Sequence, residues 1–161
     1  LFLEAGVPAA RLVEVHELLT QVHAEQHLWC DVAADAHEAL ARLRHAGLKL
    51  GIVSNSDGRV EEALVAAGLR PYFDVVVDST LAGVEKPDPA IFRAALDALG
   101  VAAAEALYVG DLYEVDVVGA NAAGIPAVLL APPGAPRPLG CAVVGSLRAL
   151  VDDLLKERLA S

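Results

Sequence analysis

The sequence predicts an α/β fold in which a helical segment precedes a layered parallel sheet. Helical periodicity alone marks roughly the first 45 residues, whereas short apolar runs alternate with helices from Leu48 onward. Apolar runs of about four to six residues between helices are typical of parallel strands that are covered on both faces. The 161 residues suit one domain of ordinary size and leave no room within this chain for a second large catalytic domain.

Two helices are predicted on the N-terminal side. Apolar residues recur at three- and four-residue spacing over Ala9–Gln26 and again over Ala34–His45, as they do in amphipathic helices. Gly47 follows the second helix, where a glycine favours a C-terminal cap. We therefore divide the chain into a helical segment, residues 1–33, and an α/β core, residues 34–161.

The predicted core alternates strands with helices. The predicted strands are Leu48–Val53, Phe73–Val77, Ala106–Val109, Ala127–Leu130 and Val143–Val144. The predicted helices that separate and follow them are Val60–Ala67, Pro89–Leu99, Val115–Ala123 and Leu147–Leu159. A glycine directly follows each of the first three of these helices, as is common at helix C-termini.

Composition restricts the function classes. Hydrophobic residues make up 55% of the chain and charged residues 21%, which predicts a folded core. The formal net charge of −10 repels phosphate backbones and anionic bilayers, so we expect no nucleic-acid and no membrane partner. Cys30 and Cys141 are too few for a disulfide framework, and no signal peptide is recognisable. A cytoplasmic location is the default expectation.

Polar side chains gather where the predicted parallel strands end. The first strand runs into Ser54 and Asn55. The third strand runs into Asp111, with Asp116 five residues further on. Lys86 lies between them in the sequence, in a loop flanked by proline. Because ligands bind beyond the carboxyl ends of the strands in open parallel sheets, these residues are the candidate site.

This combination of side chains suits phosphoryl transfer. Lysine, a hydroxyl group and backbone amides neutralise the oxygens of a phosphoryl group. Asp111 and Asp116 at one edge would repel each other unless a hard cation such as Mg²⁺ lies near them. Ser54 as a hydrogen-bond donor, Lys86 as the positive charge and the two aspartates as carriers of Mg²⁺ therefore form a consistent phosphoryl-transfer site.

Each of these residues also has a purely structural interpretation. Ser54 and Asn55 are common in helix caps and turns, and a single lysine such as Lys86 is usually solvated at the surface. Asp111 can cap a helix, and an acid such as Asp116 in a first helical turn is favoured by the helix dipole. The functional interpretation depends on the conjunction of all of them in one order.

Three segments resemble conserved motifs of the haloacid dehalogenase-like (HAD) hydrolases. They are Gly51–Gly58, Gly83–Asp88 and Val109–Asp116, and Lys-Pro-Asp-Pro followed by Gly-Asp-x4-Asp is their most specific part. The resemblance runs from about His37 to Gly134. It implies a Rossmannoid parallel sheet, and the helical segment before it is similar to part of the family's helical cap.

The resemblance implies a role for each candidate residue. Ser54 is expected to hydrogen-bond the substrate phosphate with the help of Asn55, and Lys86 to stabilise a covalent intermediate. Asp111 is expected to coordinate Mg²⁺, and Asp116 to hold that metal site directly or through other groups. The implied protein is a Mg²⁺-dependent phosphatase that acts on a small phosphorylated metabolite through an aspartyl-phosphate intermediate.

Two departures from the family pattern stand out. Leu112 occupies a position that is often serine or threonine. The chain also contains no Asp-x-Asp motif, which supplies the family's aspartate nucleophile at the end of a first strand. That strand lies at the centre of the family's sheet, between those that end at Ser54 and Gly110, so we expect the sheet to lack it. With no methionine present, we expect the chain to begin inside the cap of a longer protein and to be inactive by itself.

Two alternative functions stay open at this point. A haloacid dehalogenase also uses an aspartate nucleophile, although dehalogenases of the family generally work without a metal. A non-catalytic module that binds phosphate or a protein partner would need no nucleophile. An exposed sheet edge leaves self-association open as well, and the sequence does not identify the substrate.

Overall fold

The structure, a computed structural model, describes residues 6–25, 32–132, 134–135, 138 and 140–159. The chain divides into two compact units, Leu1–Asp31 and Val32–Ser161. This division lies two residues before the boundary that the sequence predicts. The second unit contains every candidate site residue.

The first unit contains one long helix. A 3-10 turn, Ala9–Arg11, follows Pro8 and leads into α1, Leu12–Glu25. The predicted helix is therefore present, although its last residue, Gln26, lies outside the described residues. That this helix belongs to a cap stays a prediction.

The second unit is built on parallel strands in two groups. In the first group, β1, Gly51–Ser54, pairs with β2, Val75–Asp78. In the second, β4, Ala127–Leu130, lies between β3, Tyr108–Gly110, and β5, Ala142–Val144. Because every pairing is parallel, the strand ends that carry the candidate residues share an edge within each group.

The two groups are not joined by strand pairing. Among the described residues, no backbone ladder connects β1 to β3. These are the strands that end at Ser54 and Gly110, between which the resemblance puts a further strand. The claim that a central strand is missing stays a prediction.

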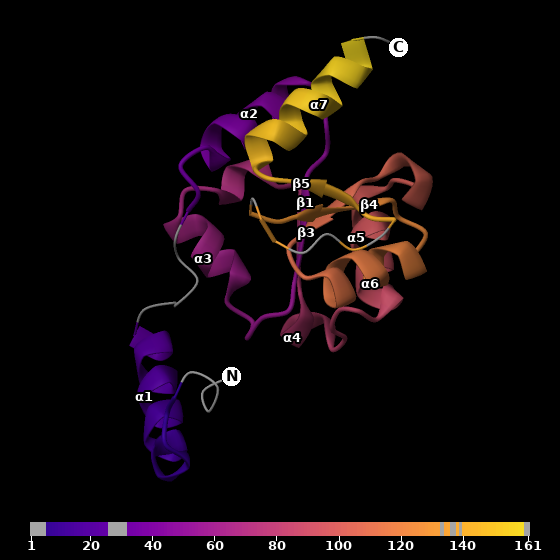
Figure 1. Ribbon diagram of the computed structural model, residues 1–161. Coiled ribbons are helices and arrows are strands. Elements are labelled where there is room, and N and C mark those ends of the chain that lie inside the picture. Colours follow the sequence, from indigo (N-terminus) through magenta and orange to yellow (C-terminus); the bar gives the residue numbers. More distant parts are fainter. Residues whose placement is uncertain (1–5, 26–31, 133, 136–137, 139, 160–161) are drawn as a thin grey trace. The chain divides into compact units, whose positions relative to one another are not determined.

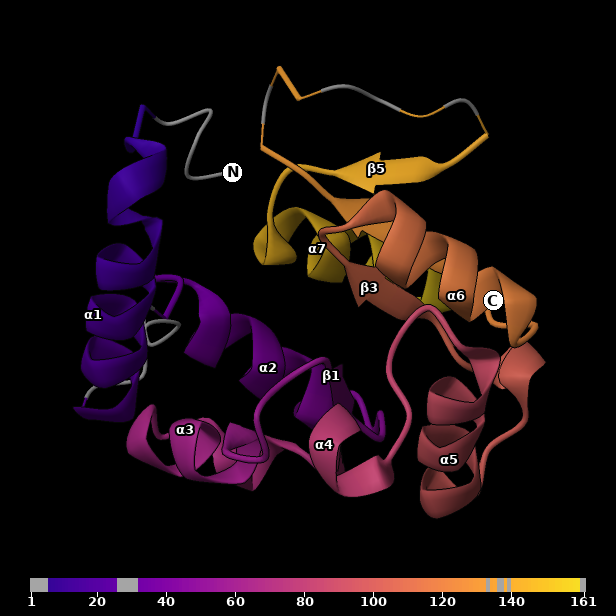
Figure 2. The same ribbon diagram turned by 90° about the horizontal axis from the view of Figure 1, so that it is seen from below.

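Helices lie on both sides of the strands (Figure 1). α2, Ala36–His45, contacts α7, Leu147–Leu159, on one side, and α5, Pro89–Leu99, lies beside α6, Val118–Ala122, on the other (Figures 1 and 2). The other helical segments are α3, Val60–Ala66, α4, Ser79–Ala82, 3-10 turns at Arg70–Tyr72 and Ala103–Glu105, and a π-helical turn at Tyr113–Val117. The predicted α/β architecture is confirmed.

Some element boundaries differ from the predicted ones. The strand predicted to begin at Leu48 begins at Gly51, because the Leu48 amide donates to the carbonyl of Leu43 and closes the end of α2. At its other end the strand is one residue longer than predicted, because Ser54 still pairs with Asp78 of β2. The sequence predicts no helix at α4, because four residues are too few to display helical periodicity.

α5 supplies the centre of the core. Its residues Ile91 and Phe92 are fully buried and pack against Ala120 of α6 and against Ile125. α5 also contacts both β1 and β2. This packing fixes the N-terminal end of α5, and with it the loop that contains Lys86, against the strands.

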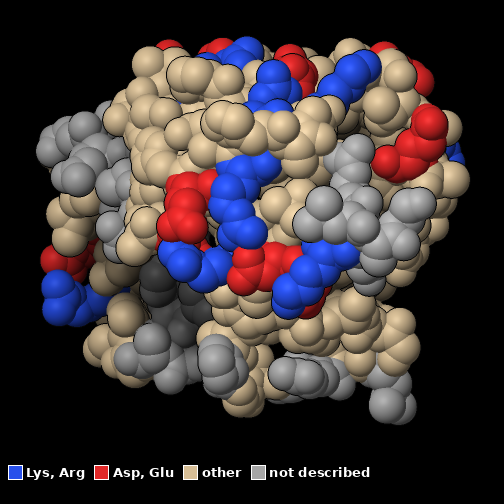
Figure 3. Space-filling model, turned by 90° about the horizontal axis from the view of Figure 1, so that it is seen from above, with Lys and Arg blue, Asp and Glu red and all other residues tan. Residues whose placement is uncertain are grey.

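Ion pairs connect α2 with α7. An Arg42 nitrogen lies 2.7 Å from an Asp152 oxygen, and Arg148 and Glu38 lie equally close. On the face in Figure 3, described acidic and basic side chains lie next to each other without a continuous basic patch.

No helix in the described part of the chain combines the length and the apolar character that a crossing of the bilayer requires.

α6 approaches α5 closely at Gly119. A Cβ atom there would lie 2.7 Å from the Phe92 ring and 2.9 Å from Cα of Pro87. We expect Gly119→Ala to lower the free energy of unfolding by about 1–3 kcal/mol, the usual cost of overpacking. Urea denaturation measures this, with Gly145→Ala as the control, because nothing lies within 4 Å of a Cβ atom at Gly145. Equal stabilities of the two variants would contradict this packing.

Candidate active site

The side chain of Asn55 ties the end of β1 to the loop that contains Lys86. Asn55 Nδ2 donates to the Lys86 carbonyl oxygen at 2.9 Å, and Asn55 Oδ1 accepts from the Lys86 amide at 2.8 Å. Both ends of the carboxamide are therefore used. The peptide bond from Lys86 to Pro87 is cis. Two residues 31 positions apart are brought together as the sequence predicts.

The ammonium group of Lys86 is held by two side chains. Its Nζ lies 2.7 Å from Asp116 Oδ1 and 3.1 Å from the hydroxyl of Tyr108. The Lys86 side chain is 12% exposed and that of Asp116 only 3%. An ion pair so far removed from water needs further hydrogen bonds to be stable, and the carboxylate of Asp116 has them.

The carboxylate of Asp116 is surrounded by donors. Oδ1 accepts from Lys86 and lies 3.2 Å from the Tyr108 hydroxyl. Oδ2 accepts from the amides of Asp111 and Leu112, at 3.1 Å and 2.9 Å. A carboxylate has about four acceptor positions, so the partners present occupy essentially all of them. Asp116 thus connects Lys86 to the backbone at the end of β3.

Local backbone geometry brings Asp116 to this place. The π-helical turn Tyr113–Val117 widens the helix entry and turns the side chain of residue 116 back toward the end of β3. π-turns are rare and occur frequently at functional sites. At Gly110 a Cβ atom would lie 2.3 Å from Cγ of Asp116, so only glycine fits there.

Tyr108 belongs to this site although the sequence did not identify it. Its hydroxyl contacts Lys86 and Asp116 and lies 3.2 Å from the carbonyl oxygen of Val53 in β1. Its ring meets Phe92 edge-on, with centroids 4.9 Å apart. Burial, and then the negative charge of Asp116, raise the pKa of the phenol. The one sequence feature that could have identified Tyr108 is that it is a tyrosine in an otherwise aliphatic predicted strand, Ala106–Val109.

None of the described residues hydrogen-bonds the carboxylate of Asp111, whereas its backbone amide donates to Asp116. An exposed carboxylate next to a strand end suits a Mg²⁺ ion, which is held by one or two carboxylates together with phosphate oxygens and water. Within the described ranges, no three His, Cys, Asp or Glu side chains are grouped closely enough to enclose a metal. Of the two acids, Asp111 therefore has the carboxylate that suits a Mg²⁺ ligand, whereas Asp116 has no free position for a direct bond. Binding of Mg²⁺ stays a prediction.

Ser54 lies at the end of β1, half-buried, opposite Asp78 of β2 in the strand register. No side-chain hydrogen bond joins it to another described residue, Lys86 and Asp111 included. The structure thus joins Asn55, Lys86, Asp116 and the backbone of Asp111. The phosphate-binding role of Ser54 and the catalytic roles of Lys86 and Asp111 stay predictions.

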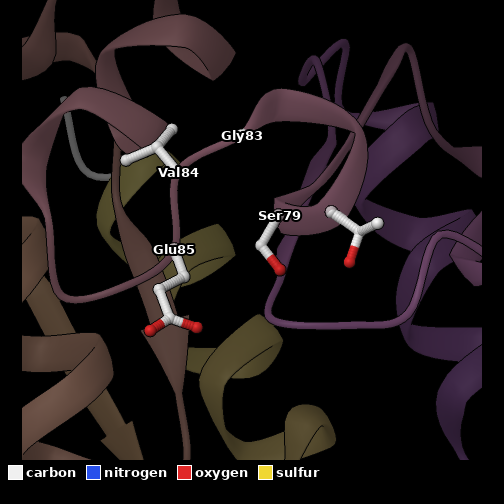
Figure 4. Close-up of a pocket in the computed structure, with 5 residues that line it drawn as sticks. Ser79, Gly83, Val84 and Glu85 are labelled. Carbon is white, nitrogen blue, oxygen red and sulfur yellow. The ribbon is translucent and has the colours of Figure 1, made fainter.

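A shallow cavity of about 350 Å³ adjoins this region. Ser79, Thr80, Gly83, Val84 and Glu85 line it, and Figure 4 shows Val84 and Glu85 on one side of it and Ser79 on the other. The lining comes from α4 and from the loop that precedes Lys86. The cavity therefore adjoins the Lys86 loop on the side of β2.

Comparison with known proteins identifies the family. The family described as haloacid dehalogenase-like hydrolase matches residues 2–130, which include all the candidate residues. The chain belongs to the haloacid dehalogenase-like hydrolases. The resemblance of its three motifs to this family is thereby confirmed.

Relatives of this HAD hydrolase include named phosphatases. A phosphoserine phosphatase of Thermus thermophilus is 40% identical over 126 residues, 78% of this chain and 49% of that protein. The haloacid dehalogenase-like hydrolase domain-containing protein 3 of Bos taurus is 40% identical over 147 residues, 91% of this chain and 57% of that protein. The HAD chain thus spans about half the length of the curated relatives it matches.

Solved structures agree with this assignment. The crystal structure of a HAD phosphatase from Thermococcus onnurineus matches with a TM-score of 0.73 and 36% sequence identity. The match covers 77% of this chain and 58% of that chain. The α/β fold and the family assignment of the chain therefore rest on both sequence and structure.

The raised pKa of Tyr108 gives a pH prediction. An unfolded tyrosine ionises near pH 10, whereas the phenol of Tyr108 keeps its proton to a higher pH because it is desolvated beside Asp116. We expect wild type and Tyr108→Phe to gain equal tyrosinate absorbance through about pH 10 while both stay folded. The contribution of this phenol to stability is complete below that pH and is lost as the pH rises above it. A smaller absorbance gain in Tyr108→Phe would show that Tyr108 ionises normally.

Proposed function

We propose that this HAD chain provides the phosphate-binding part of a Mg²⁺-dependent phosphatase that acts on a small phosphorylated metabolite. The observation that carries the proposal is the ammonium group of Lys86, held by Asp116 and Tyr108 at the strand ends. The named phosphatases among the relatives support the same reaction class.

The proposed roles follow from the charge of the substrate. A phosphate monoester carries close to two negative charges, and its transfer requires those charges to be balanced in a fixed geometry. Lys86 provides a positive charge on an ammonium group that Tyr108 and Asp116 hold, and Asn55 holds the backbone of the same residue. The hydroxyl of Ser54 is proposed to donate a hydrogen bond to a phosphate oxygen, with Asn55 keeping Lys86 beside it.

Asp111 is proposed as the residue of this chain that binds Mg²⁺. Its carboxylate has no hydrogen-bond partner among the described residues, and the Asp116 carboxylate next to it is already fully bonded. Asp116 is therefore proposed to act indirectly, by holding the Asp111 backbone and orienting Lys86. When bound, Mg²⁺ would balance phosphate charge at this edge.

The nucleophile is proposed to come from outside these 161 residues. The chain contains no Asp-x-Asp motif, and without an acceptor carboxylate the covalent transfer of the phosphoryl group cannot occur. We therefore propose that an aspartyl-phosphate forms only in a longer protein, and that this chain by itself is inactive. Its substrate is expected to be a small molecule, and a cytoplasmic location and self-association stay predictions.

Phosphatase activity tests this proposal. We expect the chain alone to release no p-nitrophenolate from p-nitrophenyl phosphate. A longer protein in which the chain is preceded by an Asp-x-Asp strand should hydrolyse the ester only with Mg²⁺. Asp111→Asn in that protein should lower the rate on the order of a hundredfold or more, because the Mg²⁺ that balances the phosphate charge loses a charged ligand. Absorbance assays with and without EDTA measure the rates.

The controls separate the alternatives. Asp97→Asn removes an exposed carboxylate from α5 and should leave the rate unchanged. Unaltered turnover in Asp111→Asn would refute the metal assignment. Halide release from a 2-haloacid without Mg²⁺ would assign the protein to the dehalogenases, and a longer protein without either activity would indicate a binding module.

A further inference from the structure

Asp78 is a buried acid that the proposed function does not use. It is the last residue of β2, and 4% of it is exposed. In the strand register it lies directly opposite Ser54. A carboxylate is rarely buried without a full set of hydrogen bonds, so its partners indicate what it holds in place.

The carboxylate of Asp78 binds the backbone of the loop that follows β1. One oxygen, Oδ1, accepts from the amides of Gly58 and Thr80, at 3.1 Å and 3.0 Å. The other, Oδ2, accepts from the amide of Val60 at 3.3 Å. The bond to Thr80 starts α4, whereas the other two reach across from β2 to a different segment of the chain.

The two residues after Asp78 bind the same loop two positions earlier, at Ser56. The hydroxyl of Ser79 accepts from the Ser56 amide at 3.1 Å and lies 3.3 Å from the Ser56 carbonyl oxygen. The hydroxyl of Thr80 donates to that carbonyl oxygen at 2.6 Å. Three consecutive side chains of β2 and α4 therefore hold residues 56–60, which directly follow Ser54 and Asn55.

We propose that Asp78 is a positioning residue of the loop at residues 56–60, which follows the proposed phosphate-binding residues Ser54 and Asn55. By fixing the amides of Gly58 and Val60, it sets the path of the chain just after Ser54 and Asn55. Through Asn55, which holds both backbone groups of Lys86, the same restraint reaches the ammonium group. This inference rests on the proposed function, because it assigns Asp78 to the orientation of the groups that bind phosphate.

Asp78→Asn tests whether the negative charge of Asp78 and its bonds to the Gly58 and Val60 amides are needed to hold the loop. Asparagine keeps the size of the side chain, but its NH2 group replaces one acceptor oxygen and faces a backbone N–H, which is also a donor. At least one of the loop amides then loses its partner. We expect faster hydrogen exchange at Gly58 or Val60 and shifted NMR signals of the Asn55 carboxamide and the Lys86 amide.

Asp74→Asn is the matched control. Asp74 directly precedes β2, accepts from the Leu50 amide at 2.8 Å and pairs with Arg44. The same substitution there also removes hydrogen bonding from β2, but at the other end of the strand. If Asp78 had no part in positioning the loop, the two variants would bind inorganic phosphate with similar affinity.

Binding of inorganic phosphate to the whole chain, followed by NMR titration, is the decisive readout. We expect Asp78→Asn to weaken binding roughly tenfold, as the loss of a bond to a charged group suggests. Asp74→Asn should stay within about twofold of wild type, because it lies away from the strand ends. If Asp78→Asn does not fold, Thr80→Val, which removes only the exposed hydroxyl bonded to Ser56, should show a smaller loss in the same direction.

Two results would overturn parts of this account, and they differ. Wild-type affinity together with unshifted Asn55 and Lys86 signals in Asp78→Asn would refute the positioning role. If the wild-type chain binds no phosphate, the proposed function fails. In that case, the Asn55 and Lys86 signals of Asp78→Asn still decide whether Asp78 orients the loop.

Discussion

The site depends on one ion pair, between the ammonium of Lys86 and the carboxylate of Asp116. Lys86 Nζ lies 2.7 Å from Asp116 Oδ1, and the side chains of Lys86 and Asp116 are 12% and 3% exposed, respectively. Removing two charges from water costs several kcal/mol per ion, so the pair persists only if the remaining donors and acceptors are satisfied. Tyr108 and two amides at the end of β3 meet that requirement for Asp116.

This constraint explains the local sequence around β3. The carboxylate can reach the Asp111 and Leu112 amides because a π-helical turn follows the strand. It can approach the strand that closely because residue 110 has no Cβ atom. The spacing Gly-Asp-x4-Asp therefore reflects a turn in which the side chain of the second aspartate reaches back to the backbone at the strand end. Asn55 holds Lys86 in position by binding its backbone amide and carbonyl group.

Much of this could be predicted from sequence because it follows from strand ends. Asn55 and Asp116 were predicted from their places after parallel strands and Lys86 from its proline-flanked loop, and the structure joins them. The different roles of Asp111 and Asp116 were not predictable, because their spacing in the sequence does not reveal that the carboxylate of Asp116 is fully hydrogen-bonded and that of Asp111 is not. Tyr108 and Asp78 were missed for a related reason: both lie within strands, and their partners belong to segments distant in the sequence.

The coupling between Lys86 and Asp116 is measured most directly by a double-mutant cycle on the free energy of unfolding. Lys86→Met and Asp116→Asn each leave a buried group without its charged partner, which costs about 3–5 kcal/mol when the pair is well buried. We expect the double variant to lose at least about 1 kcal/mol less than the sum of the single losses. Additivity within about 0.5 kcal/mol would contradict the account, because it would mean that the two charges do not interact in the folded protein.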